Sequence, residues 1–146
     1  MSLDLVAFGE EHLLALLRLY EAEGWPSFPR DPALAGRAFS APGVVSLVAL
    51  ADGEVVGFAR LLTDGALEAY LCELVVAETQ RRQGVGRALI EEAFAQSGAR
   101  RLDVLAEEGS EAFYRSFEHR RFAGYRLYPG TPARRRPTRT GAPRAR

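Results

Sequence analysis

An arginine- and glycine-rich turn, Arg81 to Arg87, contains the residue types best suited to bind a phosphate group. It follows an apolar run that includes Val75 and Val76, and it opens into a segment with helical spacing. Glycines let the backbone approach a ligand closely, while the first N–H groups of a helix lack internal partners and carry positive potential. Arginine side chains add charge-assisted donors. The turn therefore predicts a site for a nucleotide-like cofactor.

Two well-known phosphate loops do not fit this turn. A Walker loop needs a lysine after its last glycine, and the chain contains no lysine. A dinucleotide fingerprint needs a third glycine where the chain has Leu89. A plain strand-to-helix turn with surface arginines stays open as the alternative to a cofactor site.

The segment Arg81 to Gly86 does match the pattern R/Q-x-x-G-x-G/A. In this pattern the chain resembles the GNAT superfamily of acyl-CoA-dependent N-acetyltransferases, and the resemblance extends over about Val44 to Tyr128. It implies that acetyl-CoA is the acyl-donor co-substrate and that no metal takes part. The cofactor-binding positions that it implies are Leu74, Val75, Val76, Arg81, Arg82, Gln83, Gly84, Val85, Gly86, Arg87 and Ala88.

The resemblance also implies the chemistry, which is direct attack of a primary amine on the acyl thioester. Glu73 matches the position where many members carry an acidic residue that receives the amine proton. It is the only carboxylate inside its predicted strand, and strand alternation places it on one face with Leu71 and Val75. A solvated or salt-bridged strand glutamate is the alternative.

Tyr114 matches the tyrosine that some members use as a general acid toward the thiolate of coenzyme A. With Phe113 it resembles the Phe-Tyr pair of the last family helix, although the Gly-Phe that commonly follows is missing. An aromatic core residue is the alternative role for Tyr114. Trp25 and Phe28, in a proline-rich loop, either pin that loop to the core or line a pocket.

Length and composition indicate one domain followed by a tail. The sequence has 146 residues, and we expect an acetyltransferase domain over 1–130. Residues 131–146 contain six arginines, three prolines and no apolar side chain larger than alanine, so we expect a disordered tail that is dispensable for folding. No apolar run could span a membrane, no signal peptide is recognised, and the single cysteine, Cys72, cannot form an internal disulfide. These features predict a cytoplasmic protein.

Hydrophobic periodicity and turn residues predict an α/β (α+β) fold: a mixed, mostly antiparallel central sheet flanked by helices, as in GNAT proteins. Two Asp-Gly turns join three of the strands as hairpins, and a strand-helix-strand unit adds a parallel strand. The expected helices cover residues 10–21, 31–39, 86–97 and a segment from Ser110, and the expected strands cover 44–50, 54–62, 67–77, 102–106 and 122–128.

The sequence leaves the acceptor unidentified, as a small-molecule amine or a peptide N-terminus. A non-catalytic acyl-CoA-binding or sensor module is the main rival hypothesis. The arginine-rich tail suggests a nucleic-acid partner, but all acidic residues lie at or before Glu118, and an acidic body argues against nucleic-acid binding as the main function. A homodimer stays open.

Overall fold

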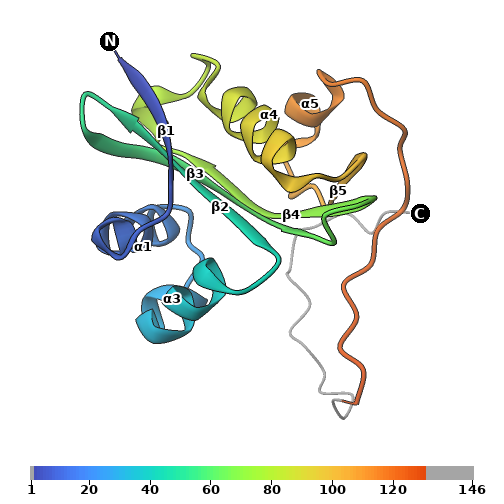
Figure 1. Ribbon diagram of the computed structural model, residues 1–146, viewed down its shortest axis with the longest axis horizontal. Coiled ribbons are helices and arrows are strands. Elements are labelled where there is room, and N and C mark those ends of the chain that lie inside the picture. The colour runs from blue at the N-terminus through green and yellow to red at the C-terminus, as the bar shows by residue number, and fades with distance from the viewer. Residues whose placement is uncertain (1, 131–146) are drawn as a thin grey trace.

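The computed structural model describes residues 2–130 and contains a five-stranded sheet with helices on both faces (Figure 1). The strands lie in the order in which they occur in the chain, and the three pairings among the first four strands are antiparallel. The fifth strand pairs with the fourth in parallel. This arrangement confirms the predicted mixed, mostly antiparallel sheet. The strands are β1 (Leu3–Ala7), β2 (Val44–Ala51), β3 (Glu54–Thr63), β4 (Glu68–Val76) and β5 (Arg101–Val104).

The helices form two layers around the sheet (Figure 1). One face is covered by α1 (Leu13–Ala22), which a short 3-10 turn η1 (Glu10–His12) precedes, and by α2 (Ser27–Arg30) and α3 (Pro32–Ser40). The opposite face is covered by α4 (Val85–Ser97) and α5 (Glu111–Arg115). A second 3-10 turn, η2 (Glu78–Gln80), links β4 to α4.

Local signals in the sequence explain where these elements begin and end. The Asp31 carboxylate accepts a hydrogen bond of 3.1 Å from the backbone N–H of Leu34, so it caps α3 as predicted, and Pro32 fills the first helical position. At the β2–β3 hairpin Asp52 and Gly53 have φ of 49° and 83°. Two consecutive positive φ values are the geometry of a tight two-residue hairpin turn.

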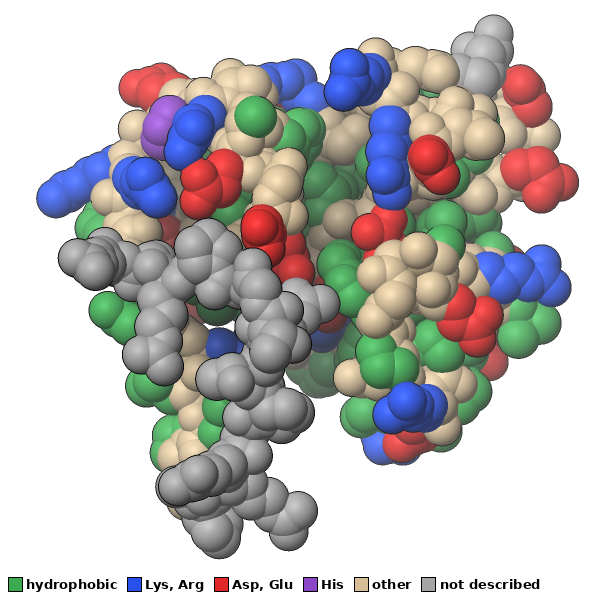
Figure 2. Space-filling view, turned by 180° about the vertical axis from the view of Figure 1, so that it is seen from behind, with side chains coloured by type: hydrophobic (Ala, Val, Ile, Leu, Met, Phe, Trp, Pro, Cys, Tyr) green, Lys and Arg blue, Asp and Glu red, His purple; other side chains and the backbone are tan. Residues whose placement is uncertain are grey.

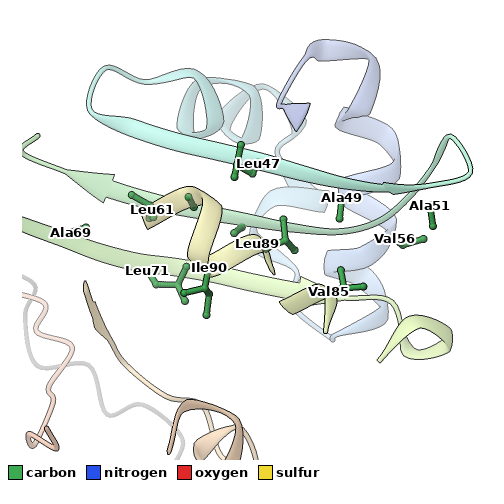
Figure 3. Close-up of a cluster of buried hydrophobic side chains, with 12 residues drawn as sticks. Leu47, Ala49, Ala51, Val56, Leu61, Ala69, Leu71, Val85, Leu89 and Ile90 are labelled. Carbon is green, nitrogen blue, oxygen red and sulfur yellow. The ribbon is translucent and has the colours of Figure 1, made fainter. Parts of the chain in front are cut away.

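The main core lies between the sheet and α4 (Figure 3). Leu89 of α4 is fully buried there against Leu47 and Leu61 of the central strands. A second, more aromatic core lies between the sheet and α1–α3, and it contains Tyr20 and Phe58. Because both faces of the sheet are covered, the middle of β2 and of β3 is buried continuously rather than in alternation.

We expect Leu89→Ala to lower the free energy of unfolding by about 2–5 kcal/mol, because it removes a fully buried side chain and leaves a cavity under α4. Urea unfolding followed by circular dichroism measures this effect. Leu14 is 70% exposed on α1, so Leu14→Ala is the matched control and should change stability by less than about 1 kcal/mol. Equal losses in both variants would contradict the described packing of α4.

The structure corrects the sequence analysis at both ends of the domain. Strand β1 was not predicted, and it pairs with the outer edge of β2. The strand predicted over 122–128 is wrong, since no helix or strand is present from Ser116 to Gly130. Apolar side chains of this segment are exposed, with Tyr125 81% and Leu127 74% accessible, so no sheet face holds them in place. The predicted disordered tail, 131–146, lies outside the described residues.

Candidate active site

Strand β4 loses its partner on one side halfway along its length. Its parallel pairing with β5 ends at the residues Leu71 and Val104, whereas β4 itself continues to Val76. Among the described residues, no strand pairs with Cys72 to Val76 on that side. Backbone donors and acceptors at a strand edge can pair with an extended ligand that carries amide groups. Leu74, Val75 and Val76 therefore lie on an edge that can receive such a ligand.

The turn that follows β4 is shaped as an anion site. Arg82 and Gly84 have φ of 62° and 82°, and such positive values fold the chain sharply just before α4 begins. The backbone N–H of Ala88 donates to the Gly84 carbonyl at 3.0 Å. The backbone N–H groups of residues 82–87 donate to no other described residue. These free donors at the N-terminus of a 13-residue helix favour a phosphate.

The room for a ligand around the turn at residues 82–87 differs from one residue to the next. A Cβ at Gly84 would meet no atom of residues 2–130 within 4 Å, so the turn is open there. A Cβ at Gly86 would lie 3.3 Å from Cζ of Phe113, so this glycine lets α5 pack closely. Val85 is buried in the core and can offer only its backbone to a ligand. Ala88 is half-buried in the first turn of α4.

The side chains predicted to bind the cofactor do not all face the turn. Arg82 is exposed and forms no ion pair with any described residue, so its guanidinium is free for a phosphate. Arg81 instead donates to the Val76 carbonyl at 3.0 Å and pairs with Glu23 at 2.5 Å. Gln83 has only a long contact, 3.5 Å, to a carbonyl of η2.

The Arg87 side chain is held against residues of α5 and just after it, and not at the turn of residues 82–87. Its Nη2 donates to the Ser116 hydroxyl at 2.8 Å, and its guanidinium carbon lies 3.9 Å from the ring centroid of Phe117. It also pairs with Glu91 one turn along α4 at 3.3 Å. The prediction that the Arg87 side chain binds the cofactor is therefore not supported by this geometry, although its backbone N–H still belongs to the turn.

Glu73 is paired with Arg60 on the neighbouring strand. Both carboxylate oxygens accept hydrogen bonds of 2.7 Å from this guanidinium, and the two side chains are only 17% and 14% exposed. The structure therefore shows Glu73 in a salt bridge, which was the alternative role considered for it in the sequence. Burial alone would lower the pKa of Arg60, but its hydrogen bonds and attraction to Glu73 outweigh this and hold that pKa above its usual value.

A bulge at Cys72 corrects the predicted direction of Glu73. In the β3–β4 register Arg60 faces Glu73 whereas Leu61 faces Leu71, so Cys72 is an extra residue. Leu71 packs under α4, but Val75 packs with the aromatic core near α1. Glu73 shares its face with Val75 as predicted, and not with Leu71, because the extra residue reverses the alternation.

Tyr20 of α1 completes the surroundings of the Arg60–Glu73 pair. Its side chain is 3% exposed, and its hydroxyl forms no hydrogen bond of good geometry with any described residue. Burial, followed by the negative charge of Glu73, raises the pKa of Tyr20 well above its usual value, so the hydroxyl stays neutral.

Burial also raises the pKa of the Cys72 thiol. A reactive thiolate is therefore not favoured at Cys72.

Tyr114 lies on α5, on the opposite face of the sheet from Glu73. It is half-buried beside Phe113, with ring centroids 5.1 Å apart, and it packs against the core under α4. Burial, with a smaller effect from the charge of Glu107, raises the pKa of Tyr114 to about 12. The structure therefore does not bring Glu73 and Tyr114 together, and the open edge of β4 lies between their two faces.

Arg60 and Tyr20 are the residues that sequence reasoning missed. A single arginine inside an apolar strand resembles an ordinary solvent-facing residue, and Tyr20 resembles a core position of an amphipathic helix. Aligning the two predicted hairpin strands would have placed Arg60 close to Glu73, and two opposite charges inside apolar strands are a usable signal.

Residues 2–130 lack the features of two other kinds of site. No helix of this part of the chain has the length and apolar character needed to cross a membrane. No group of three or more His, Cys, Asp or Glu side chains there is arranged to hold a metal ion.

Comparison with solved structures supports the same fold. An aminoglycoside acetyltransferase from an uncultured soil metagenomic sample superposes with a TM-score of 0.71 at 26% identity, over 90% of this chain and all of that one. A GNAT family acetyltransferase from Streptococcus pneumoniae TIGR4 gives 0.68 at 26% identity, over 89% and 98%. The aminoglycoside acetyltransferase AAC(6')-Iy, in complex with a coenzyme A bisubstrate analogue, gives 0.68 at 24%, over 88% and 99%.

Sequence comparison assigns the chain to one family. A curated relative, the mycothiol acetyltransferase of Streptomyces scabiei (strain 87.22), is 34% identical over 110 residues. These residues make up 75% of this chain but only 35% of the relative, so the chain spans about a third of that protein's length. The model of the acetyltransferase (GNAT) family matches residues 10–118. This match covers well over half of the sequence, so the chain belongs to the GNAT acetyltransferase family.

Proposed function

We propose that the protein is an N-acetyltransferase that moves an acetyl group from acetyl-CoA to a primary amine. The observation that carries the proposal is that two sets of backbone groups lie next to each other: an edge of β4 that has no strand partner among the described residues, where only the Val76 carbonyl is taken by Arg81, and the N–H groups of residues 82–87. The unpaired edge of β4 suits an extended amide-bearing chain, and the turn at residues 82–87 suits a pyrophosphate. Coenzyme A contains both groups in sequence, and AAC(6')-Iy, which shares the fold, has been solved with it.

The chain's residues fit the co-substrate and suggest a division of labour. Arg82 and the N–H groups of residues 82–87 would hold the phosphates, and Leu74 to Val76 would hold the pantetheine arm through their backbone. The bound thioester supplies the acetyl group and a thiolate leaving group. Positioning is the main contribution of the protein, since holding two reactants in place removes much of the entropic barrier.

Glu73 and Tyr114 would act from the two faces of β4. An amine that approaches from the α1–α2 side meets Glu73, which would orient the amine or receive its proton directly or through water. A leaving thiolate on the α4–α5 side would meet Tyr114, whose hydroxyl is protonated at neutral pH as in any tyrosine, and burial moves its pKa further from neutrality, to about 12. Tyr114 therefore stays available as a proton donor on its side of β4.

The test is the release of coenzyme A from acetyl-CoA over a library of primary amines, followed with a thiol-reactive dye. An amine-dependent release that yields the acetylated amine is expected. If acetyl-CoA binds but no amine is acetylated, the acyl-CoA-binding or sensor module replaces the enzyme.

The described surface seen in Figure 2 does not favour a nucleic acid as the main partner. On the face in Figure 2, arginine and acidic side chains of the described residues are interspersed instead of gathered by sign. A nucleic-acid site normally gathers basic residues on one surface.

We propose an amine acceptor, either a small molecule or a peptide N-terminus, and a cytoplasmic location in keeping with the single Cys72. Formation of a homodimer stays a hypothesis that size-exclusion chromatography with light scattering tests.

We expect Glu73→Gln to lower kcat by roughly tenfold with little change in acetyl-CoA affinity, since Glu73 lies on the face of β4 away from α4 and the phosphate turn. The change replaces a carboxylate by an amide of the same size. Steady-state kinetics at several pH values and calorimetric titration of acetyl-CoA measure the two effects. Glu78→Gln, on the exposed turn η2, is the matched control. If the acetyl-CoA affinity of Glu73→Gln falls while kcat is retained, the assignment of Glu73 to the acceptor side is wrong.

A further inference from the structure

Arg60 and Glu73 form the most enclosed ion pair among the described residues. Both carboxylate oxygens accept hydrogen bonds of 2.7 Å from the guanidinium, and the two side chains are 14% and 17% exposed. Every other ion pair between described residues contains at least one side chain that is 50% exposed or more. An enclosed pair adds little net stability, because lost hydration offsets the attraction of the two charges. Its main consequence is that each side chain fixes the position of the other.

Aromatic side chains of α2 and α3 hold the Arg60 guanidinium in place. Its carbon Cζ lies 5.5 Å from the ring centroid of Phe28 and 5.7 Å from that of Phe39. The buried ring of Tyr20 meets both of these rings edge-on, at 5.1 and 6.4 Å. A planar guanidinium over ring faces in such an apolar layer has little freedom to turn. Arg60 is therefore a fixed anchor for the carboxylate that it binds.

Glu73 needs an anchor because β4 has lost its strand partner on one side there. The parallel pairing with β5 ends at Leu71, and the bulge at Cys72 follows directly. Beyond it, β4 pairs only with β3 among the described residues. Without the bulge, Glu73 would share the face of Leu71, and its carboxylate would enter the apolar core under α4. The bulge brings Glu73 opposite Arg60 instead.

Arg60 leaves the Glu73 carboxylate able to accept further hydrogen bonds. Each carboxylate oxygen has two lone pairs, and the guanidinium takes one at each oxygen. No other described side chain donates a hydrogen bond of good geometry to this carboxylate, and the buried Tyr20 hydroxyl beside it has no such bond either. The carboxylate is thus held in one orientation, with a lone pair at each oxygen left for an amine N–H or a bridging water.

We propose that Arg60 is a positioning residue for acetyl transfer, which fixes the Glu73 carboxylate so that its remaining lone pairs meet the attacking amine. Arg60 itself touches neither substrate, and its effect passes through Glu73. The proposal rests on the proposed function, since it requires the role assigned there to Glu73. It adds the residue that sets the orientation of this carboxylate.

Arg60→Lys tests this role, because lysine keeps the positive charge but cannot bind both oxygens as a planar fork. It should lower kcat roughly three- to tenfold, at most the effect of Glu73→Gln, and leave acetyl-CoA affinity within about twofold. In a Glu73→Gln background the same substitution should change kcat by less than about twofold, because the group that it positions is gone. Steady-state kinetics of the four proteins and calorimetric titration of acetyl-CoA measure these effects.

Arg101→Lys is the matched control for the charge pair. It makes the same substitution in an exposed pair, between Arg101 of β5 and Glu68 of β4, and should leave kcat unchanged. Full kcat in Arg60→Lys overturns the proposal. An equal loss in the two backgrounds also overturns it, since Arg60 would then act on the fold and not through Glu73.

A second variant serves if Arg60→Lys does not fold. Phe28→Leu removes one ring face from the guanidinium and should lower kcat about two- to fivefold, the effect of one lost cation–π contact, but only when Glu73 is present. Full kcat in Phe28→Leu, or the same loss in the Glu73→Gln background, then overturns the proposal. A wild-type protein that acetylates no amine rejects the proposed function as well, whereas an active wild type with full kcat in Arg60→Lys rejects the role of Arg60 alone.

Discussion

Gly84→Asp is expected to weaken acetyl-CoA binding by about a hundredfold, the effect of one added negative charge within several ångströms of two phosphates. Gly84 has a φ of 82° and lies at the cap of α4, and a Cβ there meets no described atom within 4 Å. The new carboxylate therefore enters the open side of the turn, where the N–H groups of residues 82–87 would hold the pyrophosphate. Isothermal titration calorimetry with acetyl-CoA measures the loss.

Gly84→Asn is the matched control, because asparagine has the same shape and tolerates a positive φ as well as aspartate does. It should weaken binding far less, and both variants should unfold at the same temperature. Similar affinities in the two variants would mean that charge at this turn is irrelevant, and the phosphate assignment would then be wrong. Gly86 is a poorer position for the same test, since a side chain there would press on Phe113 before it met a ligand.

The conformation of the turn at residues 82–87 could be predicted from sequence because it depends mainly on the local backbone. Glycine at position 84, the start of α4 and the end of β4 are all local features, and local features determine which N–H groups remain free. The same is true of the Asp31 cap and the Asp52-Gly53 turn, which the structure confirms. The Arg87 side chain could not be placed in this way, because its partner Ser116 lies 29 residues away in sequence.

Glu73 shows why the side-chain contacts on the α1–α3 face of β4 were harder to predict. Its position in an apolar strand was evident, but its face depended on a bulge at Cys72 that no residue type announces. Its partner Arg60 is set by the register of β3 against β4, which is a long-range property. The strand predicted over 122–128 was wrong for a related reason. Its composition favours a strand, but a strand also needs a neighbouring strand with which to pair. The structure provides no such neighbour within the described residues.

Tyr114→Phe is expected to lower kcat by roughly ten- to a thousandfold, the range for loss of a general acid, while acetyl-CoA affinity stays within about twofold. The substitution removes only the hydroxyl, and the Tyr114 hydroxyl makes no hydrogen bond to any described residue, so stability should change little. Pre-steady-state measurement of acetyl transfer is the appropriate experiment, because slow product release would hide a change in the chemical step.

The pH dependence of the same reaction distinguishes an acid from a core aromatic residue. Because the pKa of Tyr114 is raised to about 12, its hydroxyl remains protonated as the pH rises from 7 to 10, and the wild-type chemical step should not lose rate through this group over that interval. A leaving thiolate that receives no proton from Tyr114 must take one from water, so the Tyr114→Phe rate should depend on added buffer acids while the wild-type rate should not. Phe117→Leu, which alters a neighbouring ring of α5 without removing a hydroxyl, is the control for packing. Full turnover in Tyr114→Phe, with acetyl transfer limiting the rate, would leave Tyr114 as a core aromatic residue and assign protonation of the thiolate to solvent.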